Sequence, residues 1–277
     1  MRRPSRESAI ERRTCPVCVG AELRDLDALG HRRLAGCRRC GHRFVARCDD
    51  ALLEAEYRAA YYDGAEDPRI AAWAAAHQRV WDAVLEQILA IAPRATSLLD
   101  VGAGSGGFLL RVRTRSPALQ LAAVEPAAAA RAALRQRLPD VTFPAETADR
   151  LGDVAARFDV VTMLQTLEHL RDPLAACRGA WTCLRPGGLF LVAVPNRRSF
   201  AVWRRGRAAD CYANGTHLQF FAAREVRRLL RSAGFAHVRR LIAFGGGQHA
   251  AWLPSLAQYA ARVAGFATEV RFVAQRV

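Results

Sequence analysis

Two cysteine pairs in the first part of the chain have the spacing of a metal site. Cys15 and Cys18 form one Cys-x-x-Cys pair, and Cys37 and Cys40 form a second pair after 18 intervening residues. Four thiolates in two such pairs are a common ligand set for one tetrahedral zinc ion, whose closed site leaves no position for substrate. The pattern therefore predicts a structural four-cysteine zinc ribbon that depends on Zn²⁺ to fold. His42 is a weaker ligand candidate.

A glycine-rich turn further along has the pattern of a nucleotide-binding loop. Gly102, Gly104 and Gly107 match Gly-x-Gly-x-x-Gly after an apolar run, and Glu125 follows about 20 positions later. Asp100 lies two positions before the first glycine, where the pyrophosphate of a dinucleotide would approach. At about 4 Å and an effective dielectric near 20, that repulsion costs about 4 kcal/mol. The acid therefore favours S-adenosylmethionine, which is cationic and carries no phosphate.

Three side chains are candidates for acid–base chemistry. Glu168 and His169 follow an apolar run, where the carboxyl end of a strand would place them at the ligand-binding edge of a sheet, and His217 follows in a later loop. A histidine here would take a proton from an acceptor, or Glu168 and His169 would together bind a divalent ion. The alternative is structural: His169 caps the turn before a helix starting at Asp172-Pro173, and His217 makes a hydrogen bond in its loop. The sequence leaves both interpretations open.

The elements that must position these residues alternate from Thr96 onward. Short apolar runs alternate with helical stretches, which indicates an α/β fold with a mostly parallel sheet covered by helices on both faces. The predicted strands are 97–101, 119–124, 141–143, 159–164, 189–194, 237–244 and 269–277. The predicted helices are 107–115, 127–138, 147–155, 173–184 and 223–233.

Differences in composition divide the chain into three predicted parts. Residues 1–48 form the zinc-ribbon module, residues 49–95 a helical linker or lid, and residues 96–277 the α/β domain. Helices are expected over 51–62 and 70–91. In the second helix, apolar residues recur at mostly three- and four-residue steps and predict one buried stripe; they are Trp73, Val80, Val84, Leu85, Ile88 and Ile91.

Several motifs occur in the order found in class I S-adenosylmethionine-dependent methyltransferases. Residues 100–106 resemble the first motif of that family, and residues 124–126 resemble the end of its second strand. Residues 158–161 and 167–173 resemble the fourth-strand region of the ubiquinone-type and related small-molecule methyltransferases. Residues 184–190 resemble the turn into the fifth strand, and residues 216–221 a later motif of the same group.

The resemblance implies a Rossmann-like sheet of seven strands, with the last strand antiparallel, and one S-adenosylmethionine site at the carboxyl edge. By analogy, Glu125 would hold the ribose hydroxyls and Gln165 would face the methionine portion. The residues that would hold the methionine end are Asp100, Gly102, Gly104 and Gly106. Tyr57, Tyr61 and Tyr62 lie where related enzymes often keep a lid, although packing is the alternative interpretation.

The acceptor is predicted less sharply than the cofactor. A zinc module joined to a methyltransferase domain resembles two groups of enzymes. One group methylates sugars, glycans or secondary metabolites, and the other methylates ribosomal RNA. The Glu-His-Leu and Thr-His-Leu motifs favour methyl transfer to O, N or C of a small molecule or glycan precursor. The net charge of +15, carried on the basic side entirely by arginine, fits the RNA alternative. A non-enzymatic zinc ribbon that binds nucleic acid is a third, remote interpretation.

The remaining expectations concern location and assembly. No apolar run has the length of about 20 residues that a membrane-spanning helix needs. The arginine-rich start has no apolar segment behind it, so the sequence predicts no secretory signal and a cytoplasmic protein. The sequence does not predict the oligomeric state.

Overall fold

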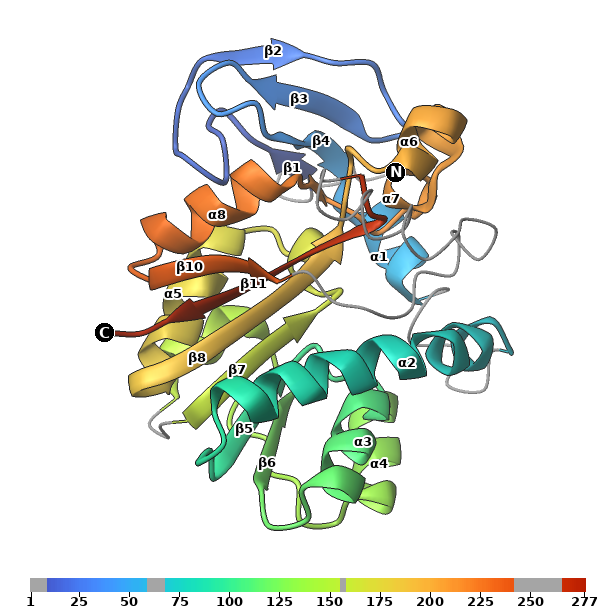
Figure 1. Ribbon diagram of the computed structural model, residues 1–277. Coiled ribbons are helices and arrows are strands. Elements are labelled where there is room, and N and C mark those ends of the chain that lie inside the picture. Colours follow the sequence, from blue (N-terminus) through green and yellow to red (C-terminus); the bar gives the residue numbers. More distant parts are fainter. Residues whose placement is uncertain (1–8, 59–67, 155–157, 242–265) are drawn as a thin grey trace.

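Two sheets make up the framework of the molecule. The computed structural model describes residues 9–58, 68–154, 158–241 and 266–277. A small antiparallel sheet lies above a larger, mostly parallel one in the view of Figure 1. The large sheet has the order β10-β11-β8-β7-β5-β6. Its strands are β5 (Ser97–Val101), β6 (Gln120–Val124), β7 (Phe158–Leu164), β8 (Leu184–Pro195), β10 (Ala236–Leu241) and β11 (Glu269–Gln275).

The direction of the strands in the large sheet agrees with the predicted fold. β5 pairs in parallel with β6 and with β7, and β7 pairs in parallel with β8. β11 is antiparallel to both of its neighbours, β8 and β10. The expectation of a last strand running against the others is therefore confirmed.

The predicted number of strands is wrong, because the described sheet has six strands and not seven. The run 141–143 was expected to be a strand, but it makes only an isolated parallel bridge between Thr142 and Ala122. The run is three residues long and ends at Pro144, which has no backbone N–H to extend a ladder.

Helices cover both faces of the large sheet, as predicted (Figure 1). One face packs against α2 (Pro68–Ile91), α3 (Gly107–Arg115) and α4 (Ala128–Arg137), and the other against α5 (Pro173–Cys183) and α8 (Ala223–Ser232). Side chains alternate between the faces of a strand, so neighbouring residues of β5 enter different cores: Leu98 packs with α2 and α3, and Leu99 with α5 and α8. The predicted helix 147–155 is a short 3₁₀-helix, η2 (Ala148–Asp153).

The stripe predicted on α2 is confirmed where its side chains are described. Val84, Leu85 and Ile88 are buried in the core between α2 and the sheet, Val80 is also buried, and Ile91 is half-buried. The side chain of Trp73 lies outside the described residues.

The small sheet combines four strands from the first 49 residues with one strand from a distant part of the sequence. Its order is β1-β4-β3-β2, and β9 pairs with β4 in antiparallel fashion. The strands are β1 (Ala9–Glu11), β2 (Leu23–Asp25), β3 (Arg33–Cys37), β4 (Arg43–Asp49) and β9 (Gln219–Phe220). The cysteine module thus shares backbone hydrogen bonds with the segment that follows β8.

Short elements connect the two sheets. α1 (Asp50–Tyr57) follows β4 and is capped by Asp49, whose side chain accepts from the amides of Ala51 and Leu52. Between β8 and β9 lie α6 (Phe200–Arg205), η4 (Gly206–Ala208) and α7 (Asp210–Ala213). η3 (Leu167–His169) follows β7. None of the helices described is both long enough and apolar enough to cross a membrane.

Candidate functional site

The glycine loop after β5 is built for close backbone approach. Gly102 has φ +79°, and a Cβ there would lie 2.3 Å from Oγ1 of Thr166. Only glycine fits both that left-handed conformation and that contact. The amide of Gly102 donates to the carbonyl of Val124 at the end of β6 (2.7 Å), which ties the loop to the neighbouring strand.

Glu125 closes this loop from the end of β6. Its Oε2 accepts from the amide of Gly104 (2.8 Å), and its Oε1 accepts from the amide of Ala127 (2.9 Å). Each carboxylate oxygen has a second lone pair, so both can still accept hydrogen bonds from ribose hydroxyls. Burial raises the pKa of Glu125, and the two amides oppose that shift.

Asp100 lies beside Glu125 at the end of β5 and is 3 % exposed. Its Oδ1 accepts from the hydroxyl of Thr162 on β7 (2.6 Å). Burial raises the pKa of Asp100 to about 7; the hydrogen bond from Thr162 opposes this shift, and the charge of Glu125 adds to it. Two buried acids at the tips of adjacent strands favour a cation and disfavour a phosphate, so these residues fit S-adenosylmethionine.

Gln165 follows β7 with φ +56°, a conformation that is uncommon outside glycine and often marks functional sites. Its side-chain amide donates to Glu269 on β11. Its backbone amide donates to the carbonyl of Ala193 on β8 (2.9 Å). Gln165 is therefore at the carboxyl edge, as expected, but its contact with a cofactor stays a prediction.

The structure brings the three acid–base candidates together. One possible ligand atom from each of Glu168, His169 and His217 can be chosen so that the three atoms lie within 4.8 Å of one another. The two imidazole rings meet edge to face, with centroids 4.8 Å apart. A shared proton, an acceptor hydroxyl or a divalent ion would each suit this donor set.

Both histidines are held through Nδ1 by groups that fix the tautomer. Nδ1 of His217 donates to the carbonyl of Cys211 (2.9 Å), and Nδ1 of His169 lies 3.3 Å from the carbonyl of Thr216. A carbonyl only accepts, so each neutral ring carries its proton on Nδ1 and has its lone pair on Nε2. Burial lowers the pKa of His169 to about 3 and that of His217 to about 4. Both rings are therefore neutral at pH 7.

Glu168 is 1 % exposed, and neither of its carboxylate oxygens has a hydrogen-bonding partner in another described residue. Burial raises the pKa of Glu168 to about 8, so the group is mainly protonated at pH 7. A buried acid of this kind is costly to the fold unless a ligand satisfies it. The capping role considered for His169 belongs to Asp172, whose side chain accepts from the amide of Ala175 at the start of α5 (2.9 Å).

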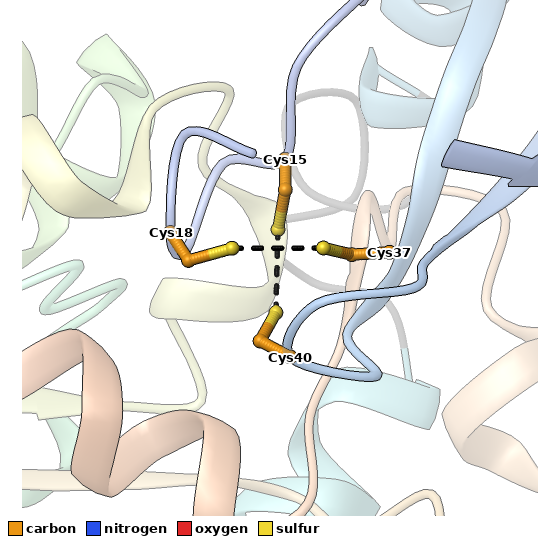
Figure 2. A group of neighbouring side chains, drawn as sticks. All are labelled: Cys15, Cys18, Cys37 and Cys40. Atoms are coloured by element: carbon orange, nitrogen blue, oxygen red, sulfur yellow. Dashed lines mark hydrogen bonds between the residues drawn. The ribbon is translucent and has the colours of Figure 1, made fainter. Parts of the chain in front are cut away.

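The four predicted metal ligands converge on one point (Figure 2). The sulfur atoms of Cys15 and Cys40 are 3.5 Å apart, as are those of Cys18 and Cys37. Around a tetrahedral zinc ion with Zn–S bonds of about 2.3 Å, sulfur atoms lie about 3.8 Å apart, so the arrangement fits that ion. His42 is not needed as a ligand: it is fully buried, and its Nε2 lies 3.0 Å from Oε1 of Gln219.

Comparison with known proteins places this architecture in a family. A family model described as a methyltransferase domain matches residues 73–241. The chain belongs to this methyltransferase-domain family. It is 33 % identical over 152 residues to a ubiquinone biosynthesis O-methyltransferase of Ruegeria pomeroyi, a match that covers 52 % of this chain and 61 % of that protein. The chain thus spans less than two thirds of this relative.

Solved structures of methyltransferases share the fold. A methyltransferase of Thermotoga maritima, described as a possible histamine N-methyltransferase, has a TM-score of 0.56 at 18 % identity, covering 81 % of this chain and all of that one. An amino pentose methyltransferase of Micromonospora echinaspora, solved with S-adenosylmethionine, has a TM-score of 0.51 at 21 % identity, covering 76 % and 96 %. At these identities the likeness establishes the fold alone.

Several residues of this candidate site were not predicted. Thr162 on β7 donates to Asp100, and Thr166, two residues after β7, donates to the carbonyl of Val101 just before the glycine loop. Glu269 on β11 accepts from the side chain of Gln165. Threonine in an apolar strand gives no sequence signal of such a role, because its hydroxyl pairs across strands. Tyr57 donates to the carbonyl of His169 (3.2 Å), whereas Tyr61 and Tyr62 lie outside the described residues.

Proposed function

We propose that this protein transfers the methyl group of S-adenosylmethionine to an oxygen, nitrogen or carbon of a small molecule or of a sugar, glycan or secondary-metabolite precursor. The observation that carries the cofactor assignment is the pair of buried acids, Asp100 and Glu125, beside the glycine loop. Asp100, Gly102, Gly104 and Gly106 would hold the methionine end, Glu125 the ribose, and Gln165 the methionine portion.

The chemistry needs positioning and, for a hydroxyl or amine acceptor, removal of one proton. Bound S-adenosylmethionine supplies an electrophilic methyl group, which bonds to the acceptor's lone pair as the S–C electrons stay on sulfur. His217 would take the acceptor's proton on Nε2, because Cys211 fixes its Nδ1 proton. Protonated Glu168 would orient the acceptor by donating a hydrogen bond, and His169 would pack against His217.

The relatives support a small-molecule acceptor. The Ruegeria protein is named for O-methylation in ubiquinone biosynthesis, and the Micromonospora protein for an amino pentose. Both names describe low-molecular-weight acceptors, which agrees with a catalytic cluster buried between the two sheets.

A groove lined by arginine favours RNA as the second candidate acceptor. It lies between α8, β10 and the second cysteine pair, and its cationic lining is Arg39, Arg224, Arg227, Arg228, Arg231 and Arg240. Among the residues that the structure describes, no acidic side chain lines this groove. Burial lowers the pKa of Arg240, and the neighbouring Arg227 adds to this shift, so an anion would relieve the repulsion. Phosphodiesters are one such anion.

A structural Zn²⁺ at Cys15, Cys18, Cys37 and Cys40 completes the proposal. Such an ion would stabilise the small sheet without taking part in methyl transfer, since four thiolates leave it no open position. The division of the chain at residues 48 and 95 also stays a prediction.

Transfer of label from methyl-labelled S-adenosylmethionine tests the function. The purified protein would be incubated with the small-metabolite fraction of a cell extract or with total RNA. We expect label in the metabolite fraction, and at least tenfold less with H217Q, about 1.4 kcal/mol of lost transition-state stabilisation. Label in RNA, lost with R228E and R231E, would favour the second candidate. Activity in H217Q that depends on added Mg²⁺ would contradict the proton-acceptor role.

A further inference from the structure

The segment that carries His217 is held in place by the cysteine module. Arg32, between β2 and β3, is only 5 % exposed although it is charged. Its Nη1 donates to the carbonyls of Asn214 (2.9 Å) and His217 (3.0 Å), and its Nη2 to the carbonyl of Tyr212 (3.3 Å). The planar fork of a guanidinium can reach three carbonyls at once, which the ammonium group of lysine does less well.

Backbone hydrogen bonds form a second connection. In the β4–β9 pair, Phe44 stands opposite Gln219. Next to it, the amide of Val45 donates to the carbonyl of Leu218, and the amide of Leu218 donates to the carbonyl of Glu168, both at 2.9 Å. β4 therefore reaches the buried acid of the candidate catalytic cluster through one intervening residue.

The second cysteine pair provides a third connection. His42 follows Cys40 by two positions and packs between Phe44 and Phe221. Its Nε2 lies 3.0 Å from Oε1 of Gln219, whose amide donates to the carbonyl of Leu170 (2.9 Å), next to His169. A change in the turn Cys37–Cys40 would displace His42 and, through it, Gln219 near His217 and Leu170 next to His169.

The cofactor loop has different supports. Within the described residues, the side chains of Asp100 and Glu125 accept hydrogen bonds from Thr162, Gly104 and Ala127, all of which lie on the large sheet or in the loops next to it. The two halves of the site meet at Thr166, whose carbonyl accepts from the amide of His169 (3.0 Å), but the hydrogen bonds to the two acids do not involve the cysteine module.

We propose that the four-cysteine module is a structural part of the acceptor site. Arg32 is a positioning residue for His217, and a metal ion bound by the cysteines keeps the side chains of Glu168, His169 and His217 in their relative positions. This inference rests on the proposed function for its catalytic consequence, but its structural content can be tested without an acceptor. Loss of the metal, or of Arg32, would disable methyl transfer while leaving cofactor binding intact.

The first test compares R32M with R32K and with R33M, a matched control at an exposed neighbouring position. The readouts are the zinc content, the affinity for S-adenosylmethionine by calorimetry, the ¹⁵N imidazole signals of His169 and His217, and label transfer. In R32M we expect zinc to be kept, cofactor affinity within about twofold of wild type, shifted His217 signals and at least tenfold less transfer. R32K should recover part of the loss, and R33M should match wild type.

Unchanged His217 signals in R32M would overturn the positioning role, and so would a loss of cofactor affinity as large as the loss of transfer. If R32M does not fold, the wild-type protein decides. Its zinc would be removed by a chelator in the presence of S-adenosylmethionine, and the His169 and His217 signals should shift while the cofactor stays bound. Signals that do not move would refute the inference. If wild type transfers no label at all, the proposed function fails while the imidazole signals still decide this inference.

Discussion

The buried acid at the end of β5 makes cofactor affinity depend on pH. The pKa of Asp100 is raised to about 7, chiefly by burial, in the protein without cofactor. A cationic cofactor binds the carboxylate form, so below that pKa a proton must leave before the cofactor binds. The sign follows directly: affinity rises with pH and levels off above about pH 8.

The magnitude comes from the same pKa. The apparent dissociation constant of the cofactor is proportional to one plus ten raised to the power of the pKa of Asp100 minus the pH. This factor is about 11 at pH 6 and about 1.1 at pH 8, a tenfold change worth about 1.4 kcal/mol. At pH 6, binding should release about 0.9 proton for each cofactor bound, and at pH 8 about 0.1.

Isothermal titration calorimetry in buffers with different ionisation enthalpies measures both quantities. The α-amino group of the cofactor itself titrates at about 7.7–8.0, and the pKa of Glu125 is also raised by burial, so D100N serves as the control that keeps these contributions and removes that of Asp100. Between pH 6 and pH 8 we expect the dissociation constant of wild type to change about tenfold more than that of D100N. Equal pH profiles for the two proteins would refute the assignment of Asp100 to the cofactor site.

Three further predictions concern stability, metal and the acid–base cluster. G102A should unfold in urea with about 1–3 kcal/mol less stability than wild type, because its Cβ would meet Thr166. In G104A no atom lies within 4 Å of the added Cβ, so a loss as large as in G102A would contradict the steric explanation. C37S should lose the one zinc per chain that metal analysis should find in wild type, and retained zinc would exclude the four-thiolate site. E168Q should raise the melting temperature at pH 7 in calorimetry, because burial forces Glu168 to take up a proton on folding and an amide needs none, while label transfer falls. A lower melting temperature would mean that hydrogen bonds satisfy the carboxyl group.

The large sheet was predictable because its signals are local. β5 and β7 are mostly apolar runs. The elements that begin and end within one residue of their expected bounds are β5, β6, β7, α3, α4, α5 and α8. The run 141–143 failed because hydrophobicity alone does not say whether a neighbouring strand has room for a full ladder. The isolated bridge at Thr142 shows the difference.

The cofactor loop and the cysteine site were also visible, since their residues stand close together in the sequence. The contact between His169 and His217 was not visible, although each residue was named, because it joins two loops that are 48 positions apart in the sequence. Arg32 could not be found by any pattern. Among the many arginines of this chain, nothing in its neighbours distinguishes a buried side chain that reaches three carbonyls from a solvated one.

The pairing of β4 with β9 also constrains how the chain is made. His42 and Gln219 are 177 positions apart in the sequence. At a translation rate of about 5–20 residues per second, β9 is therefore synthesised roughly 9 to 35 s after β1–β4. During that interval the part of β4 that later pairs with β9, Arg43 and Phe44, has no strand on that side, whereas all four cysteines have already been made. We therefore expect a ribosome-bound chain that ends before β9 to bind a metal ion at the cysteines before the small sheet is complete.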